Sequence, residues 1–386
     1  MDDLLKLGVV GSRRGASLAA TCAESTGIRV VALCDSDAAA ARHASLPMYS
    51  DLDALLEHDI DAVLLANYFH EHAGLAIRCL QAGKHVLSET TACFTLAEGV
   101  ALIEAVENSG CTYMLAENYP YMRHNQEMRR LYDAGTIGTF RYGEGEYVHP
   151  MSSAEADSLA PGENHWRNWL PVTYYSTHSL APLVYITGCE PVRVNGFAIT
   201  DDGNDPNRAR TRRRMDLAGA IMVTMADGAV AKLLQYDLRG EGNWTRVHGT
   251  AGLMENARFG QPGSVRVRRE VFDKKPGEPV ERLYLPDFPR HHDAATAAGH
   301  GGGDYFVLLE FAEAVRTGRR PFFDVYRAVA MSAVGSQAWR SCLESGAPQP
   351  IPDFHDPAVR ARYAGDTFSP DPASPNPVPV RIPRNA

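Results

Sequence analysis

Short apolar runs alternate with helical patterns along the first 120 or so residues of the chain. The runs are four to seven residues long, are mostly β-branched or leucine-rich, and lack the alternation of a half-exposed strand. They predict buried parallel strands at 4–10, 29–34, 62–66, 85–88 and 113–116, with helices between them at 16–24, 51–57, 72–82 and 96–108. Gly83 and Gly110 supply C-terminal helix stops. This order predicts a doubly wound parallel sheet.

The rhythm changes after residue 122. Alternating apolar and polar positions predict strands at 140–148, 192–200, 219–226, 229–238, 245–250 and 264–271, and helices at 123–134, 304–317 and 325–345. Asp227-Gly228 predicts a tight hairpin. The tail from Pro352 is rich in Pro, Asp and Asn, so we expect it to lack regular structure. The predicted parts are therefore a parallel α/β domain (1–121), an α/β domain with an open, mainly antiparallel sheet (122–351), and an extended tail (352–386).

Composition narrows the class of protein. The 386 residues are 45% hydrophobic with a net charge of −9, which suits two globular domains and argues against nucleic acid or anionic membrane as a partner. No run approaches the roughly 18 apolar residues of a membrane span. The acidic start does not resemble a signal peptide, and the seven cysteines are scattered without a CxxC pair. We expect reduced thiols and a cytoplasmic protein.

A glycine turn follows the first predicted strand, at Gly11-Ser12-Arg13-Arg14. Such a turn lets backbone approach a pyrophosphate at a helix N-terminus, although Arg13 replaces the second glycine of GxGxxG. Asp35 ends the second strand, 24 residues after Gly11, where a carboxylate binds the adenosine ribose and disfavours a 2′-phosphate. Together they predict NAD rather than NADP. Alone, each has a structural alternative, a plain tight turn and a helix-capping acid.

Several further segments make the chain similar to the Gfo/Idh/MocA family of oxidoreductases. They are 48–56, 61–65, His70-Glu71-His72, 82–86 and 249–252. The resemblance implies a Rossmann domain, NAD, and a C-terminal α/β domain whose open sheet forms a homo-oligomer contact, in a dimer or tetramer. The chain departs from the family at Ser88-Glu89-Thr90, where its usual dehydrogenases carry Glu-Lys-Pro with a lysine near the reacting carbinol.

The lysine-free segment also resembles the NAD-dependent glycosidases of glycoside hydrolase family 109. The shared motifs are Glu117-Asn118, Tyr147-Val-His149, Trp166-Arg167, Tyr175-Ser-Thr-His178 and the glycine-rich run 299–305. The resemblance implies cofactor contacts from the glycine turn, Asp35, Asn67, His70, His72, Glu89 and Asn118. It implies a sugar pocket that includes His149, Trp166, Arg167, Thr177, His300 and Tyr305.

That family resemblance also implies a reaction. NAD⁺ takes hydride from C3 of a glycoside, the ketone acidifies the C2 proton, a base removes it and the aglycone leaves C1. Water then adds and the hydride returns, so the net reaction is hydrolysis without the paired carboxylates of ordinary glycosidases. We assign His178 as the acid–base residue, with Tyr147 and Tyr175 assisting. The substrate is then a small sugar or glycoside.

Alternatives remain at this stage. A sugar or cyclitol dehydrogenase would reduce NAD in proportion to substrate, and a non-catalytic NAD and sugar sensor would bind without turnover. His70-Glu71-His72 and His291-His292 lack a third ligand at recognisable spacing, so we expect no metal. The basic run 208–214 predicts a solvated or interface segment, with a grip on an anionic sugar as the alternative.

Overall fold

The computed structural model describes residues 4–35, 46–240, 242–258 and 261–383. The chain forms two compact units. The first comprises Met1–Met122, Pro289–Val329 and Phe354–Thr367, and the second Arg123–Phe288, Ala330–Asp353 and Phe368–Ala386. Both units are discontinuous, the first division along the chain falls after Met122, and helix α11 (Val325–Leu343) contributes residues to each unit.

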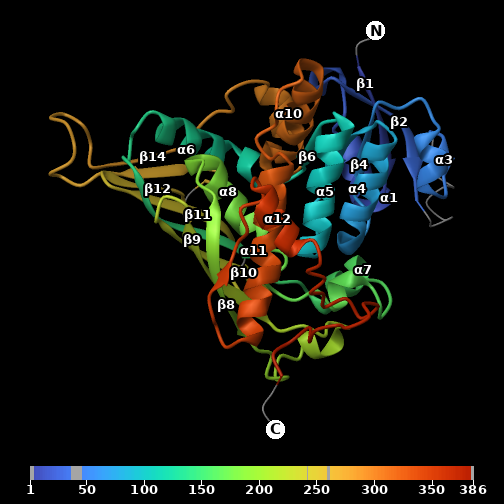
Figure 1. Ribbon diagram of the computed structural model, residues 1–386. Helices are drawn as coiled ribbons and strands as arrows, with labels where there is room; N and C mark the ends of the chain where they lie inside the picture. The colour runs from blue at the N-terminus through green and yellow to red at the C-terminus, as the bar shows by residue number, and fades with distance from the viewer. Residues whose placement is uncertain (1–3, 36–45, 241, 259–260, 384–386) are drawn as a thin grey trace. The chain divides into compact units, whose positions relative to one another are not determined.

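The first unit is built on a six-stranded parallel sheet with the order β3-β2-β1-β4-β5-β6. The strands, in chain order, are Leu5–Val10, Ile28–Cys34, Met48–Tyr49, Ala62–Leu65, His85–Ser88 and Tyr113–Leu115. Helices α1 (Ser12–Ala19), α3 (Leu52–Leu56), α4 (His72–Gln81) and α5 (Leu96–Ser109) connect them (Figure 1). The predicted doubly wound sheet is confirmed. Helix α1 begins at Ser12, earlier than the predicted residue 16.

Later segments complete this unit. They contain α9 (His292–Ala297), α10 (Gly303–Thr317), the start of α11, and α12 (Pro357–Tyr363). The expectation of no regular structure after Pro352 is wrong at α12. Asp356 caps that helix by accepting a hydrogen bond from the Ala358 amide. Pro357 has no N–H, but the first residues of a helix do not donate to an acceptor within the helix, so a proline is tolerated at this position. Arg360 of α12 then binds Glu107 of α5 at 2.6 Å.

The second unit is built on a nine-stranded sheet with the order β14-β13-β12-β11-β7-β10-β9-β8-β15. All its neighbours are antiparallel except β7 and β10, so the predicted open, mainly antiparallel sheet is confirmed. The predicted hairpin joins β9 and β10, with Gly228 at a φ of 85°. Strands β12, β14 and β15 were not predicted. The strands β7 to β15 are Phe140–Val148, Pro191–Ile199, Ala218–Met225, Val230–Tyr236, Gly242–Gly249, Gly252–Asn256, Val265–Arg268, Glu281–Tyr284 and Gln349–Pro350.

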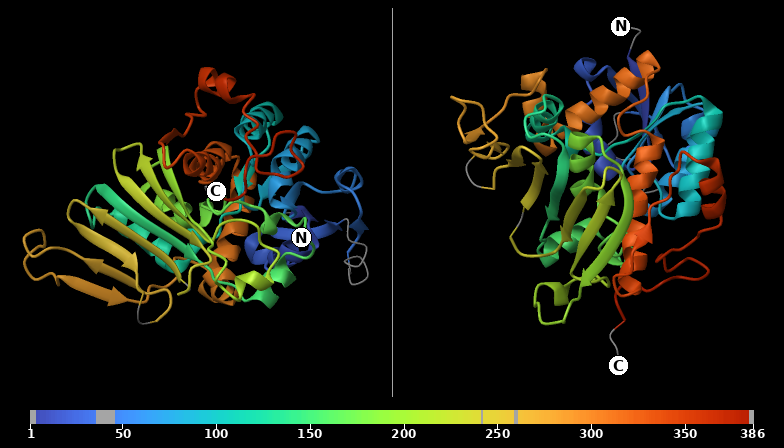
Figure 2. Two further views of the ribbon diagram at one scale, coloured as in Figure 1. Left: turned by 90° about the horizontal axis from the view of Figure 1, so that it is seen from below. Right: turned by 60° about the vertical axis from the view of Figure 1, so that its left-hand side comes forward.

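Helix α8 (Thr177–Thr187) packs on one face of this sheet (Figure 2). The unit also contains helices α6 (Arg123–Asp133) and α7 (Ser153–Leu159). Gly143 and Gly145 of β7 allow the close approach. A side-chain carbon on Gly143 would lie 3.0 Å from Leu183, and one on Gly145 would overlap the Ser179 carbonyl oxygen. The glycines therefore fix where the first turn of α8 lies over the sheet.

Three findings concern the described ranges only. No helix within them is long and apolar enough to cross a membrane. No group of three or more His, Cys, Asp or Glu side chains within them is arranged to hold a metal ion. None of the seven cysteines, all of which lie in described segments, is in a disulfide.

Candidate active site

Five residues predicted to bind the cofactor follow the carboxyl ends of neighbouring parallel strands in the first unit. Gly11 follows β1, Asp35 follows β2, Asn67 follows β4, Glu89 follows β5 and Asn118 follows β6. The strand order reverses direction between β1 and β4. Doubly wound sheets bind their ligands at this edge, outside such a switch point.

The turn between β1 and α1 depends on Gly11. Its φ of 91° lies in the region that favours glycine, and a side-chain carbon would lie 2.5 Å from the Ala66 carbonyl oxygen. The next amide, of Ser12, donates to Oδ2 of Asp35 at 2.7 Å. The Asp35 carboxylate is therefore held beside the start of α1, while Arg13 is exposed.

Arg14 lies in a polar cluster within the first unit. Its guanidinium donates to Glu89 at 2.6 Å and to Asp304 at 2.8 Å. Asp304 also accepts from Asn118 Nδ2 at 2.8 Å and contacts His300 Nδ1 at 2.9 Å. Burial alone would raise the pKa of Asp304, but hydrogen bonds from His300 and Arg14 hold it well below its usual range. The cluster ties the glycine turn to the end of β5 and the start of α10.

The segment before α4 holds the remaining predicted cofactor residues. His72 is buried, its Nδ1 lies 3.0 Å from the Thr91 carbonyl oxygen, and burial lowers its pKa. Asn67 Nδ2 donates to Glu71 at 2.9 Å, and His70 is partly buried. These side chains lie at the same edge of the sheet as the glycine turn, because they follow β4.

The residues at this edge fit NAD. Gly11, the residue before α1, brings no side chain to the start of the helix, so the backbone there can approach a pyrophosphate closely. The Asp35 carboxylate follows β2, at the position where the carboxylate of a Rossmann domain would bind a ribose. Asn118 is buried, and its Oδ1 has no hydrogen-bond partner in the protein. A donor from the cofactor would satisfy this oxygen.

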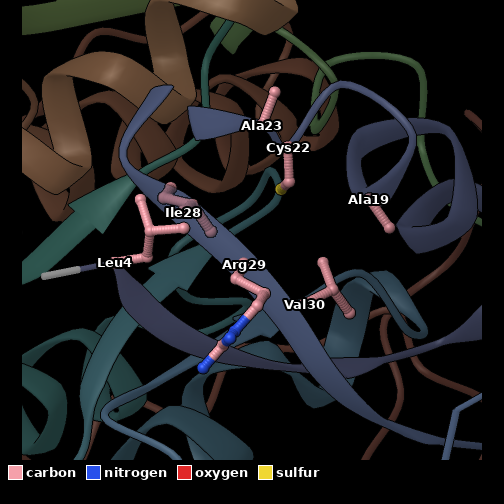
Figure 3. A pocket seen from close by; sticks show the side chains of 7 residues that line it. All are labelled: Leu4, Ala19, Cys22, Ala23, Ile28, Arg29 and Val30. Atoms are coloured by element: carbon pink, nitrogen blue, oxygen red, sulfur yellow. The ribbon is translucent and has the colours of Figure 1, made fainter. Parts of the chain in front are cut away.

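A shallow pocket on the same unit lies at the other edge of the sheet (Figure 3). It is formed by the beginnings of β1 and β2 and the end of α1. Gly11 and Asp35 follow the opposite ends of these strands, so this pocket is not the predicted cofactor site. Its lining is mainly apolar: Leu4, Ala19, Cys22, Ala23, Ile28, Arg29 and Val30.

The three predicted catalytic residues meet in the second unit. The His178 ring lies 4.8 Å from the rings of both Tyr147 and Tyr175, which are 5.7 Å from each other. Tyr147 comes from β7, Tyr175 immediately precedes α8, and His178 is in its first turn. Imidazole and phenol groups are both used as general acids and bases in catalysis. We call these three residues, with Trp166 and Arg167, the aromatic cluster.

Trp166 and Arg167 join the cluster from a short 3-10 helix, Trp166–Asn168. His165 begins this helix and accepts a hydrogen bond from the Arg167 amide at 3.3 Å. The Trp166 ring stacks on Tyr175 at 6.2 Å, and the Arg167 guanidinium carbon lies 4.3 Å from the Trp166 ring centroid. A cation beside these phenols stabilises negative charge that forms there.

Tyr236 also belongs to this site but was not predicted. It ends β10, is 4% exposed, and lies 6.0 Å from the Tyr175 ring. Burial raises its pKa, and the positive charges of Arg167 and Arg213 oppose the increase. Its φ of 77° is unusual for a side chain of this size and is typical of functional sites. In the sequence it stands in an ordinary apolar strand and carries no such signal.

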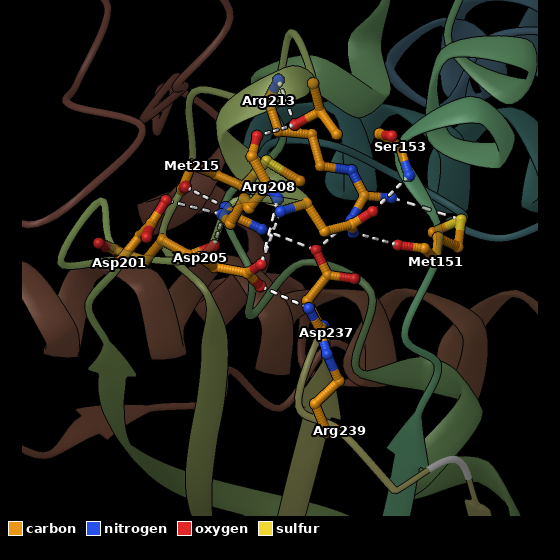
Figure 4. A network of polar contacts seen from close by, with 12 residues as sticks. Met151, Ser153, Asp201, Asp205, Arg208, Arg213, Met215, Asp237 and Arg239 are labelled. Carbon is orange, nitrogen blue, oxygen red and sulfur yellow. Dashed lines mark hydrogen bonds and ion pairs between the residues drawn. The ribbon is translucent and has the colours of Figure 1, made fainter.

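A buried ionic network follows Tyr236 (Figure 4). Asp237 accepts hydrogen bonds from Arg208 at 2.7 Å and from Arg213, and Arg208 also donates to Asp201 at 2.9 Å. The side chains of Arg208 and Arg213 are both 4% exposed. The predicted solvated or interface segment is therefore wrong for these two arginines, because both are buried and neutralise the buried Asp237. Three other arginines of the run are exposed, namely Arg210, Arg212 and Arg214.

The remaining predicted sugar-binding residues divide between the units. His149 follows β7, with its ring 5.7 Å from Tyr147, and Thr177 is the buried first residue of α8. His300 and Tyr305 belong to the first unit, whereas the residues of the aromatic cluster belong to the second. The Tyr305 hydroxyl donates to the Ser25 carbonyl oxygen at 3.0 Å, which gives this side chain a structural contact.

Comparison with family models identifies the protein family. Residues 5–117 match the model described as "Oxidoreductase family, NAD-binding Rossmann fold", and residues 125–255 match "GFO/IDH/MocA C-terminal domain". The chain belongs to the Gfo/Idh/MocA family of oxidoreductases, and its first unit contains an NAD-binding Rossmann domain. Residues 204–360 match "Glycosyl hydrolase 109, C-terminal domain".

Individual relatives are also named as glycosyl hydrolase family 109 proteins. A glycosyl hydrolase family 109 protein of Stenotrophomonas maltophilia is 26% identical over 93% of this chain and 90% of its own. Glycosyl hydrolase family 109 protein 2 of Akkermansia muciniphila is 24% identical over 89% of this chain and 81% of its own.

Solved structures share the fold. Levoglucosan dehydrogenase in complex with NADH and L-sorbose aligns with a TM-score of 0.77 at 20% identity, over 91% of this chain and all of its own. An oxidoreductase domain protein from Kribbella flavida aligns with a TM-score of 0.75 at 22% identity, over 90% of this chain and 99% of its own.

Proposed function

We propose that this protein is an NAD-dependent glycoside hydrolase that works by transient oxidation of its sugar, with His178 as its acid–base residue. The observation that carries the proposal is the position of His178, whose ring lies 4.8 Å from both Tyr147 and Tyr175. The similarity to glycosyl hydrolase family 109 proteins supports it.

The residues divide the work by their chemistry. When bound, NAD⁺ supplies a reversible hydride acceptor, so that no outside oxidant is consumed. A tyrosine of the cluster removes the proton beside the sugar ketone, and the positive charge of Arg167 stabilises the enolate that develops. His178 donates a proton to the departing aglycone oxygen and later accepts one from the water that adds. The Trp166 ring offers a flat apolar face to the sugar.

The segment around Glu89 supports cleavage through its likeness to family 109, because Thr90 stands where dehydrogenases of the wider family carry a lysine and the family 109 glycosidases also lack that lysine. Either reaction begins with oxidation of a sugar hydroxyl, so in this proposal a residue of the aromatic cluster accepts the proton of that hydroxyl. Net dehydrogenation is the second candidate, favoured by the likeness of the fold to levoglucosan dehydrogenase. A sensor that binds NAD and sugar without turnover is the third.

One assay separates the three candidates. Purified protein and NAD⁺ are incubated with a panel of chromogenic glycosides while aglycone release and absorbance at 340 nm are followed together. Aglycone release without accumulating NADH supports the hydrolase, and NADH formed in proportion to substrate, without aglycone, identifies a dehydrogenase. Binding without either signal identifies a sensor.

The chain offers a matched control for the cluster. Tyr142 lies on the same strand as Tyr147, and its hydroxyl donates to Glu144 at 2.8 Å. Tyr147→Phe should slow aglycone release at least tenfold, and Tyr142→Phe should leave it unchanged. Equal rates for both variants would remove Tyr147 from the mechanism.

The homo-oligomer remains a prediction. Four apolar side chains on strands β8 and β9 are more than a third exposed, in keeping with a face that is covered in an oligomer: Val192, Phe197, Ile199 and Met222. Light scattering of the purified protein measures the number of subunits.

A further inference from the structure

Asp304 is a buried charge of the first unit that the proposed mechanism does not use. It stands in the first turn of α10, and its side chain is 0% exposed. Burial alone would raise its pKa, but hydrogen bonds from His300 and Arg14 keep the carboxyl group ionised. A buried carboxylate is costly unless it is paired, so its partners indicate what it is for.

Asp304 determines how the amide of Asn118 is oriented. Nδ2 of Asn118 donates to Oδ1 of Asp304 at 2.8 Å. An ionised carboxylate only accepts hydrogen bonds, so the amide must direct its nitrogen toward Asp304 and its oxygen away from it. That oxygen is buried and has no hydrogen-bond partner among the described residues. Because Asn118 follows β6, the oriented amide presents an acceptor at the edge of the sheet where a doubly wound fold binds its ligand.

Two glycines make room for this contact. A side-chain carbon on Gly303 would lie 2.3 Å from the Asn118 carbonyl oxygen, and one on Gly299 would lie 2.6 Å from Oδ2 of Asp304. Gly299 has a φ of −62° and a ψ of 165°, a backbone conformation that any residue adopts. Space for the carboxylate, and not the backbone angle, therefore explains the glycine at this position.

The same carboxylate also holds Arg14. Nη2 of Arg14 donates to Oδ1 of Asp304 at 2.8 Å, and Nη1 donates to Oδ2 at 3.2 Å. Paired contacts of this kind fix the direction of a guanidinium group as well as its distance. Asp304 therefore ties Asn118 to the first turn of α1, the helix that follows the glycine turn.

We propose that Asp304 is a positioning residue for the cofactor, which fixes the Asn118 amide with its oxygen directed toward a donor group of NAD. The donors that NAD offers are the hydroxyl groups of its riboses and the N–H groups of its nicotinamide amide and adenine, whereas its pyrophosphate only accepts. Asn118 held in this orientation therefore suits a ribose or a base and not a phosphate. The inference concerns binding of the cofactor, and it does not depend on which reaction follows.

Titration calorimetry with NAD⁺ tests this role without any sugar. Asp304→Asn keeps the shape of the side chain but can donate as well as accept, so it no longer dictates the orientation of the Asn118 amide. The dissociation constant of NAD⁺ should rise roughly tenfold. Asp324→Asn is the matched control and should leave this constant unchanged. Asp324 is also a buried aspartate at the start of a helix, but it accepts from the Arg327 amide at 3.0 Å.

A double variant separates positioning from a contribution to the fold. If Asp304 acts through Asn118, Asp304→Asn should weaken NAD⁺ binding much less in the Asn118→Ala background than in the wild type. Equal weakening in both backgrounds would show that Asp304 acts independently of Asn118, and would overturn the proposal. An unchanged dissociation constant for Asp304→Asn, whatever its melting temperature, would make the contact purely structural and would also overturn it.

Gly299→Ala decides the question if Asp304→Asn does not fold. Its methyl group displaces the Asp304 carboxylate without changing any charge, so the dissociation constant of NAD⁺ should rise. Gly74→Ala in α4 is the control, because a side-chain carbon there would meet no atom of the described residues within 4 Å. Equal constants for the two glycine variants would refute the proposal. Since these titrations contain no sugar, failure of the proposed function in the glycoside assay does not alter their outcome.

Discussion

Replacing Asp237 with asparagine removes the shared partner of two buried arginines. The Asp237 side chain is 8% exposed and accepts from both Arg208 and Arg213. Removing one partner of a buried ion pair costs about 3–5 kcal/mol, because it leaves a charge without compensation. Arg208 keeps its bond to Asp201 at 2.9 Å, so we expect the lower end of this range, about 3 kcal/mol.

The complementary variant, Arg213→Met, should cost less. It removes the same ion pair, but Asp237 keeps Arg208 and no buried charge is left alone. We expect a loss of about 1–2 kcal/mol, and the double variant should lose less than the sum of the two single variants. Arg239→Met is the control, because the Arg239 side chain is 59% exposed in its pair with Asp205.

Differential scanning calorimetry measures these differences. One kcal/mol shifts the melting temperature of a domain of about 150–250 residues by roughly 2–4 °C, so Asp237→Asn should lower it by about 6–12 °C. Arg239→Met should change it by less than about 2 °C, as expected for an exposed pair. A melting temperature for Asp237→Asn that matches the control would show that the network contributes little, and would refute the reasoning.

Three further predictions concern the cofactor, the chemistry and pH. Asp35→Ala should weaken NAD binding and reduce the ratio of the dissociation constants for NADP and NAD. Fluorescence titration with each cofactor measures both constants, and an unchanged ratio contradicts the role of Asp35. His178→Asn should reduce aglycone release at least a hundredfold while NAD still binds, and near wild-type turnover would exclude His178 as acid–base residue. Burial, with a smaller effect of Arg123, lowers the pKa of His124 to about 4. As the pH is lowered, the unfolded chain therefore takes up this proton before the folded protein does. The free energy of unfolding should then decrease by up to about 1.4 kcal/mol for each pH unit between about pH 6.5 and pH 4. Urea unfolding at several pH values in this range measures the free energy of unfolding. Its dependence on pH should be weaker in His124→Gln than in the wild type, and an equal dependence contradicts the prediction.

Local patterns predicted most of the fold. The apolar runs at 62–66 and 85–88 became β4 and β5 because buried parallel strands need no polar face. Strand β14 was missed because its four residues, Glu281–Tyr284, are mostly exposed and only two of them are apolar. Helix α12 was missed because it lies in a tail rich in Pro, Asp and Asn, although Asp356-Pro357 is also a good helix start.

The candidate site shows a similar division. The sequence motifs identified Tyr147, Tyr175 and His178, and the structure brings their rings together. The contribution of Tyr236 depends on a backbone angle, and the burial of Arg208 depends on aspartates at distant positions in the chain. Neither property is a function of neighbouring residues, so a single sequence does not contain it in readable form.

The discontinuous first unit has a consequence for synthesis on the ribosome. Strand β6 is made early, but its Leu115 amide donates to the Phe323 carbonyl oxygen, and the Ala97 amide of α5 donates to that of Asp366. At about 5–20 residues per second, these partners emerge roughly ten to fifty seconds later. Until then the nascent Rossmann sheet lacks these later partners, and such incomplete intermediates are prone to aggregate or to bind chaperones. The unit that binds the cofactor is thus the first to be started, yet it is complete only when its last segment, which ends at Thr367, has been made.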